Sequence, residues 1–170
     1  MAATQASISP ATSADLADVA RIYAHYVTDS VATFEENAPD VDFWQARLDD
    51  LAVRRLPFLV ATVGGEVAGY AYATPWRPKP AYRHTVEDSI YLAPDRTGQG
   101  LGRALLGALL TSCAQTDTRQ VIAVIADTGN DASVALHRAF GFTHAGRLKS
   151  VGHKHNRWID TVLMQRTLAS

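Results

Sequence analysis

Three glycines stand at every second position, Gly98, Gly100 and Gly102, between a short alternating apolar segment and a helical one. Residues 89–92 alternate in polarity and Pro94 follows them, which predicts a strand that ends in a loop. Because glycine has no Cβ, a bulky anion can approach such a loop closely. The first N–H groups of the following helix lack intrahelical partners and lie at the positive end of its dipole. The spacing therefore predicts a phosphate-binding loop.

Two common phosphate-binding motifs do not fit these glycines. A P-loop needs Gly-Lys-Ser or Gly-Lys-Thr, and the chain contains neither. A dinucleotide-binding fold needs G-x-G-x-x-G near its first strand, whereas here G-x-G-x-G lies deep in the chain. A purely structural helix entry is a further alternative, but three glycines in five residues are entropically costly for that purpose alone.

The composition is that of an ordinary globular domain. The chain has 170 residues, 47% of them hydrophobic and 19% charged, with a formal net charge of −1. We expect one domain over residues 1–170, with no general attraction to nucleic acid or anionic membranes. The single cysteine, Cys113, cannot form an internal disulfide, and no secretory signal is recognisable, so we expect a cytoplasmic protein. No run of 18 apolar residues predicts a membrane span.

The elements that must hold the glycine loop can be read from periodicity. The expected order is strand, two helices, three strands, helix, strand, helix and two strands. Residues 120–126 form a near-continuous apolar run, typical of a strand covered on both faces. Asn130 is expected to cap the helix that ends at Gly141. This order predicts an α+β fold, a mixed sheet with helices on its faces.

The glycine loop and its surroundings resemble the GCN5-related N-acetyltransferase (GNAT) superfamily, which binds acetyl-CoA. The loop resembles the family's pyrophosphate loop, and residues 81–91 and 130–137 resemble the phosphinothricin and methionine-sulfone N-acetyltransferases within it. The similarity also covers residues 8–11, 33–35, 152–155 and 158–160, so it spans essentially the whole chain. It implies a central, mostly antiparallel twisted sheet of six to seven strands flanked by about four helices.

The resemblance also implies which residues hold the co-substrate, acetyl-CoA. Thr97 stands where the family usually has Gln or Arg, so one side-chain contact to phosphate is expected to differ while the backbone cradle remains. Tyr91 or Leu92 is expected to donate a backbone N–H to the oxyanion of the tetrahedral intermediate. The full set expected to bind the cofactor is Tyr91, Leu92, Thr97, Gly98, Gln99, Gly100, Leu101, Gly102, Arg103, Asn130 and Ser133.

Amine acetylation needs a base, because an alkyl amine is largely protonated at neutral pH. Glu87 lies on the strand that leads into the loop and is the expected general base; the alternative is a solvated strand carboxylate. Its neighbour Asp88 should point to the opposite face of a regular strand. His137 matches a position where many relatives carry a tyrosine and is expected to act as acid or proton shuttle. A packed, hydrogen-bonded histidine is the alternative reading.

The substrate is expected to contact the proline-rich loop and a facing loop. Arg77 and Arg83 could pair with the carboxylate of an amino-acid-like substrate, with Trp76 forming a pocket wall. Resemblance adds Phe34 and Glu35 from the facing loop. The full set expected on the substrate side is Phe34, Glu35, Trp76, Arg77, Arg83, Thr85 and Val86.

Other chemistry has weaker support. His153 and His155 should share one strand face, and His84 lies elsewhere, but no further ligand completes a metal site, so no metal is expected. No G-x-S-x-G motif indicates a catalytic triad. We therefore expect an acetyl-CoA-dependent N-acetyltransferase, similar to the phosphinothricin group, that transfers directly and forms a homodimer. An acetyltransferase for peptide N-termini or polyamines, and a non-catalytic acyl-CoA sensor, are the alternatives.

Overall fold

The computed structural model describes residues 5–169, and a seven-stranded sheet forms its centre. The spatial order of the strands is β1-β2-β3-β4-β5-β7-β6. All neighbouring pairs are antiparallel except β4 and β5, which run parallel. The strands are β1 (Ser7–Pro10), β2 (Phe58–Val63), β3 (Glu66–Pro75), β4 (Thr85–Leu92), β5 (Gln120–Ala126), β6 (Thr143–Lys154) and β7 (Arg157–Thr167).

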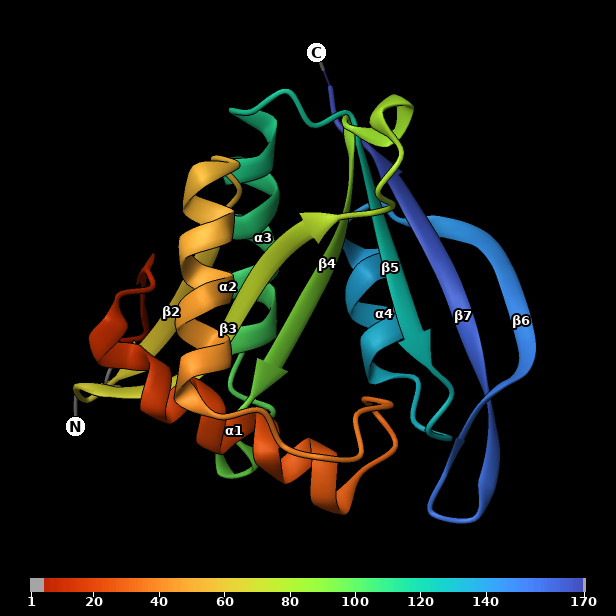
Figure 1. Ribbon diagram of the computed structural model, residues 1–170, viewed down its shortest axis with the longest axis horizontal. Helices are drawn as coiled ribbons and strands as arrows, with labels where there is room; N and C mark the ends of the chain where they lie inside the picture. Colours follow the sequence, from red (N-terminus) through yellow and green to blue (C-terminus); the bar gives the residue numbers. More distant parts are fainter. Residues whose placement is uncertain (1–4, 170) are drawn as a thin grey trace.

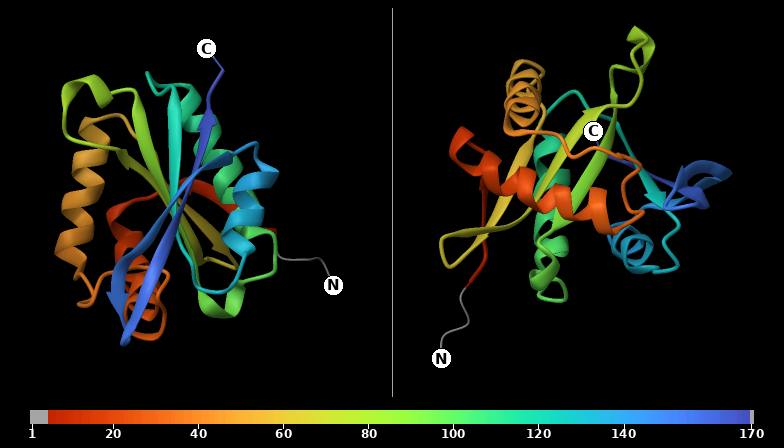
Figure 2. Two further views of the ribbon diagram at one scale, coloured as in Figure 1. Left: turned by 90° about the vertical axis from the view of Figure 1, so that its right-hand side faces the viewer. Right: turned by 60° about the horizontal axis from the view of Figure 1, so that its bottom comes forward.

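Two pairs of helices cover the two faces of the sheet (Figures 1 and 2). The helices are α1 (Leu16–Asp29), α2 (Val41–Val53), α3 (Leu101–Ala114) and α4 (Ala132–Ala139). The first pair packs on one face with an aromatic core around Trp44 and Tyr70, and α3 packs on the other around Leu105 and Leu109. The element order and the α+β class agree with the sequence-based prediction.

Hydrophobic spacing explains why these segments form helices and strands. In α1, Leu16, Val19, Ile22, Tyr23 and Val27 are all buried, at the i, i+3, i+4 spacing of one helical face. Strand β5 is apolar along its length: Val121, Ala123 and Ile125 are buried in the core on the α3 side. Val124 on the other face is 37% exposed, so the predicted cover on both faces is only partial. These patterns account for α1 and β5, and β5 pairs with β4, the strand that leads into the predicted loop.

Two details differ from the prediction. Asp131, and not Asn130, is the N-cap of α4; the Asn130 Oδ1 accepts a 2.9 Å bond from the Ala132 N–H, a local turn that precedes the helix. His153 and His155 do not share a strand face, because β6 ends at Lys154. His155 and Asn156 have φ of 51° and 58° and form the two-residue turn to β7.

Candidate active site

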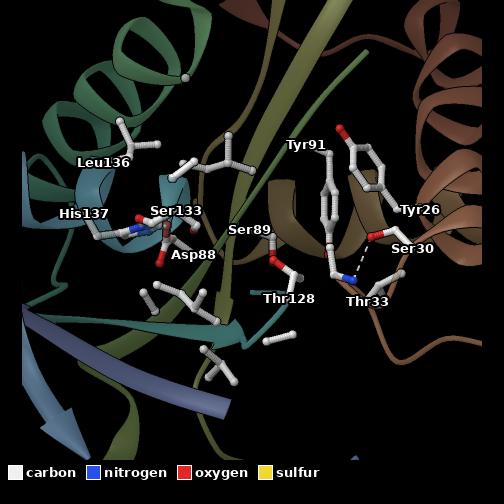
Figure 3. A pocket seen from close by; sticks show the side chains of 18 of the residues that line it. Tyr26, Ser30, Thr33, Asp88, Ser89, Tyr91, Thr128, Ser133, Leu136 and His137 are labelled. Carbon is white, nitrogen blue, oxygen red and sulfur yellow. Dashed lines mark hydrogen bonds and ion pairs between the residues drawn. The ribbon is translucent and has the colours of Figure 1, made fainter. Parts of the chain in front are cut away.

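The parallel strands β4 and β5 pair only over part of their length. Residues Thr85–Asp88 pair with Gln120–Ala123, and the strands then separate (Figure 1). A cleft of about 580 Å³ occupies the opening and is lined by both strands, α4, and the loop after α1. Its two walls are visible in Figure 3: Asp88, Ser133, Leu136 and His137 lie on one side, and Tyr26, Thr33 and Tyr91 on the other. An extended ligand can therefore enter between strands that would otherwise bond to each other.

The glycine loop joins β4 to α3 at the end of this cleft. Gly98 and Gly100 have φ of 75° and 81°, a left-handed backbone conformation that residues other than glycine rarely adopt. Gly100 is also the N-cap of α3. A Cβ on Gly102 would approach Leu136 of α4 to 3.3 Å, so this glycine permits close packing of the two helices. The unpaired N–H groups of the first turn of α3 thus open beside the cleft, where they suit an anion.

The residues expected to bind the cofactor lie in three different settings. Six of them line the cleft: Tyr91, Leu92, Thr97, Gly102, Asn130 and Ser133. Gly98, Gln99 and Gly100 belong to the exposed loop at its end. The Leu101 side chain is buried in the core, and the Arg103 guanidinium lies 5.5 Å from the Phe140 ring centroid. For Leu101, therefore, only the backbone is available to a ligand.

Tyr91 belongs to an aromatic group between the sheet and α1. Its ring centroid lies 5.1 Å from that of Tyr23, 5.2 Å from Tyr26 and 5.7 Å from Tyr70. Burial strongly raises the pKa of Tyr91, so its phenol stays protonated. The Tyr26 hydroxyl donates a short hydrogen bond to the Leu92 carbonyl. This bond ties α1 to the end of β4, at the backbone expected to meet the reacting carbonyl.

Glu87 lies on β4 at the closed end of the cleft. It is half-buried and also lines a second cavity on the α2 side of the sheet. Burial raises the pKa of Glu87 above 4.5, the charge of Asp88 raises it further, and Arg47 opposes both. A carboxylate with a raised pKa at the junction of two cavities is suited to take a proton from an amine.

Asp88 points to the other face of β4, as strand alternation predicts, and pairs with His137. The Asp88 Oδ2 is 2.7 Å from the His137 Nε2, and the His137 Nδ1 is 2.7 Å from the Ser133 carbonyl oxygen. Both side chains are almost completely buried, 5% exposed for His137 and 1% for Asp88. The Ser133 carbonyl oxygen only accepts hydrogen bonds, as does the Asp88 carboxylate when it is ionised. In the ionised pair, therefore, both ring nitrogens carry protons and His137 is an imidazolium.

The environment of His137 favours this charge. Burial on its own lowers the pKa of His137, but the hydrogen bond and charge of Asp88, with the Ser133 carbonyl, outweigh it and raise the pKa above 6.5. The ring also packs edge-on against Phe142, with centroids 4.9 Å apart. As an imidazolium with both N–H groups engaged, His137 has no lone pair with which to accept a proton. It can donate a proton to a ligand only if one of these two hydrogen bonds breaks.

The residues expected on the substrate side lie in different places. Phe34 lines the cleft, and its ring lies against Gly152, where an added Cβ would come within 2.5 Å of it. Glu35 is exposed beside it. Thr85 is half-buried at the start of β4, and the Val86 side chain is buried in the core on the α3 side, so only its backbone is free for a substrate.

Apart from Pro75, which lines the second cavity, the proline-rich loop lies outside both cavities in the described chain. Its arginines make local contacts: the Arg77 guanidinium lies 5.2 Å from the Trp76 ring centroid, and Arg83 donates a 3.2 Å bond to the Pro80 carbonyl. Both arginines are exposed, and neither they nor Trp76 line the cleft or the second cavity. The structure therefore does not bring these three residues to Glu87.

Comparison with known proteins places this geometry in a family. The family model described as "Acetyltransferase (GNAT) domain" matches residues 8–163. The chain belongs to the GNAT family. The fold and family expected from the sequence are thereby confirmed, and with them an acetyl-CoA-dependent N-acetyltransferase.

Similar GNAT proteins cover nearly the whole chain. Phosphinothricin N-acetyltransferase of Alcaligenes faecalis is 53% identical over 154 residues, which are 91% of this chain and 78% of the relative. The L-methionine sulfoximine/L-methionine sulfone acetyltransferase of Pseudomonas aeruginosa is 40% identical, covering 96% and 95%. A crystal structure of a phosphinothricin acetyltransferase from Sinorhizobium meliloti in complex with acetyl-CoA has a TM-score of 0.92 at 44% identity, covering 96% and 89%.

Sequence reasoning missed three residues of this GNAT site. Asp88 had been placed only by its strand face, and no local pattern links it to His137, 49 positions away. Lys154 is 3% exposed and its Nζ donates bonds of 3.2, 2.7 and 2.8 Å to the carbonyls of Tyr26, Ser30 and Thr33. Arg47 looks in sequence like an ordinary helix-surface charge. When the partner of a buried polar side chain lies far away in the sequence, the hydrophobic periodicity around each residue does not reveal the contact.

Neither a metal site nor a membrane span is found in the described residues. Within 5–169, no three His, Cys, Asp or Glu side chains are grouped so as to hold a metal ion. No helix in the same range is long and apolar enough to cross a membrane.

Proposed function

We propose that this GNAT enzyme acetylates the amino group of small amino-acid-like molecules of the phosphinothricin, methionine sulfoximine or methionine sulfone type. The observation that carries the proposal is the position of Glu87, half-buried where the cleft between β4 and β5 meets the cavity beside α2. The similar proteins whose names include these substrates support the choice of amine.

The transfer would be direct. Glu87 takes a proton from the ammonium group, and the amine nitrogen then attacks the thioester carbonyl carbon. The nitrogen of the tetrahedral intermediate loses its second proton to water. The C–S bond then breaks, its electron pair leaves on sulfur, and the thiolate takes up one proton. His137, an imidazolium in the cleft wall, is the proposed acid or shuttle for that proton. The backbone N–H of Tyr91 or Leu92 is proposed to stabilise the oxyanion.

We propose the cleft as the acetyl-CoA site. The pantetheine arm would lie between β4 and β5, with its pyrophosphate against the loop and the first turn of α3. Asn130 and Ser133, which line the same cleft, would contact the arm from α4. Thr97 at the end of the cleft can offer a hydroxyl where the family usually places a longer side chain.

The remaining expectations stay proposals as well. Phe34 and Glu35 would contact the amine substrate from the loop after α1, and Trp76, Arg77 and Arg83 from the proline-rich loop. We propose a single domain, a cytoplasmic homodimer, and a role in resistance, since acetylation removes the positive charge of a toxic amino-acid analogue. Arg77 and Arg83 are outside the cavities of one chain, so their role requires that loop to approach Glu87.

The test is release of CoA thiol with a panel of amines. Phosphinothricin, methionine sulfoximine and methionine sulfone should be acetylated much faster than ordinary amino acids, peptide N-termini or polyamines. Faster reaction with a polyamine or a peptide would contradict the proposed substrate class, and binding of acetyl-CoA without release by any amine would indicate a sensor.

The role of Glu87 is tested by Glu87→Gln. A general base contributes roughly 10²–10⁴-fold, so kcat should fall by that factor while the affinity for acetyl-CoA is nearly unchanged. Glu66→Gln, which changes an exposed glutamate at the start of β3, is the matched control. Unchanged turnover in Glu87→Gln would reject the assignment.

A further inference from the structure

A second cavity, of about 470 Å³, lies between α2 and the end of β3. Glu87 forms part of its wall and also part of the cleft wall, so the two cavities meet at this carboxylate. Phe43, Arg47 and Thr74 contribute further walls. A small molecule in this cavity can therefore place an amine at Glu87 without entering the cleft itself.

Arg47 is the cation of this cavity, and aromatic rings hold it in place. Its guanidinium carbon lies 5.2 Å from the Phe43 ring centroid and 5.1 Å from that of Tyr72. Stacking on two rings restricts a side chain that otherwise has many rotamers, so less entropy is lost when it binds a ligand. Tyr72 is buried at 7% exposure, which makes this support rigid.

No carboxylate among residues 5–169 forms an ion pair with Arg47. Asp50 also lines the cavity, but its Oδ2 accepts a 2.9 Å bond from the Arg54 Nε. Glu87 senses the charge of Arg47, which lowers the pKa of Glu87, yet no ion pair joins the two side chains. A half-buried guanidinium without a carboxylate partner is available for bidentate binding of an oxyanion.

The cavity thus carries two opposite charges that do not form an ion pair, the Glu87 carboxylate and the Arg47 guanidinium. An amino acid presents the complement, an ammonium and a carboxylate. We propose that Arg47 binds an oxyanion of the amine substrate while Glu87 receives its amine. The inference rests on the proposed function and gives its substrate site a specific anchor, distinct from Arg77 and Arg83 in the exposed loop.

The oxyanion has two possible sources, which a substrate series separates. All amino-acid substrates carry the α-carboxylate, whereas only phosphinothricin carries a second anion, its phosphinate. In Arg47→Gln, we expect the KM of the amine to rise about ten- to hundredfold, the loss typical of a charge-assisted hydrogen bond. An equal rise for phosphinothricin and methionine sulfone, absent for methionine sulfone amide, assigns the carboxylate. A rise for phosphinothricin alone assigns the phosphinate.

Further measurements separate substrate binding by Arg47 from its effect on the pKa of Glu87 and from effects of the substitution on folding. Because Arg47 lowers the pKa of Glu87, KM and kcat are measured across pH, and a change confined to the pH profile of kcat contradicts the inference. Arg47→Lys, which keeps the charge without the planar fork, should recover part of the lost affinity. Arg21→Gln, a change at an exposed arginine of α1 that lines neither cavity, is the matched control. KM for acetyl-CoA should stay constant in every variant.

The outcomes are distinguishable from failure of the proposed function. If the wild-type protein releases no CoA with phosphinothricin or methionine sulfone, the proposed function fails and this inference fails with it. If the wild type is active and Arg47→Gln retains its KM for both substrates, only the inference is overturned. A rise in KM in Arg77→Ala but not in Arg47→Gln would place the anchor in the proline-rich loop instead.

Discussion

Replacing Asp88 by asparagine tests the charge state of His137. The substitution keeps the size of the side chain and an oxygen that can accept the His137 N–H, but it removes the negative charge. The pair is buried, with its two side chains 5% and 1% exposed and a 2.7 Å contact. Breaking a buried ion pair by removing one partner costs about 3–5 kcal/mol. Since the hydrogen bond survives, we expect a loss of about 3 kcal/mol in the free energy of unfolding.

This loss should depend on pH in a defined direction. The folded-state pKa of His137 is raised above its ordinary value of 6.5, so the wild-type pair contributes its full stabilisation below about pH 6.5. That contribution decreases as the pH rises through the raised folded pKa. The other titratable groups near the pair are Glu87 beside Asp88 and Cys113 on α3. Burial and the charge of Asp88 raise the pKa of Glu87, and they raise the pKa of Cys113 to about 12.

Urea unfolding at a series of pH values measures the effect. The difference in unfolding free energy between wild type and Asp88→Asn should be largest below about pH 6.5 and shrink as the pH rises through the raised folded-state pKa of His137. At neutral pH a loss of about 3 kcal/mol corresponds to a decrease of roughly 6–12 °C in Tm for a chain of this size. His144→Gln, a change at an exposed histidine, is the control and should shift neither quantity. A difference that stays constant across pH would refute an imidazolium at position 137.

Two further substitutions test the glycine loop and the hydrogen bonds of Lys154 that hold the loop after α1. Gly100→Ala places a Cβ on a residue with φ of 81°, which costs about 1–2 kcal/mol; KM for acetyl-CoA should rise while KM for the amine changes little, and equal changes in both would argue against a phosphate loop. Lys154→Met removes three hydrogen bonds to buried carbonyls, each worth about 1–3 kcal/mol. We expect a loss of 3 kcal/mol or more by urea unfolding and a higher KM for the amine, because the loop that carries Phe34 is released. Lys154→Arg is the control, and full stability of Lys154→Met would show that the buried ammonium contributes nothing net.

The parts of the fold that follow from sequence are those with a local physical cause. Strand β4 runs from Thr85 to Leu92, as predicted, because prolines bound the segment on both sides. Strand β5 runs over 120–126, as predicted from its apolar run, but its second face is not fully covered, because Val124 is exposed and lines the cleft. The glycine loop was found because left-handed backbone and close approach both require glycine at Gly98, Gly100 and Gly102.

The parts that did not follow from sequence depend on contacts between distant segments. Lys154 donates hydrogen bonds to the carbonyls of Tyr26 in α1 and of Ser30 and Thr33 in the loop after it, more than 120 positions away. A lone lysine near a hairpin gives no sign of burial in the sequence. Likewise Arg47 is distinguished only by the rings of Phe43 and Tyr72, which belong to a helix and a strand. The cap of α4 was misplaced by one residue because Asn130 and Asp131 have similar capping preferences, and only the backbone conformation decides between them.

The alternation of β4 explains how two adjacent carboxylates acquire different chemistry. Glu87 and Asp88 point to opposite faces at the last residues paired with β5, so one meets the α2 side and the other meets α4. Asp88 raises the pKa of Glu87, and an unpaired Asp88 would raise it further, because the repulsion between two buried carboxylates is weakly screened. The imidazolium of His137 balances that charge from the other face. The ion pair therefore limits the effect of Asp88 on Glu87. Burial remains the main cause of the raised pKa that makes this carboxylate a better proton acceptor.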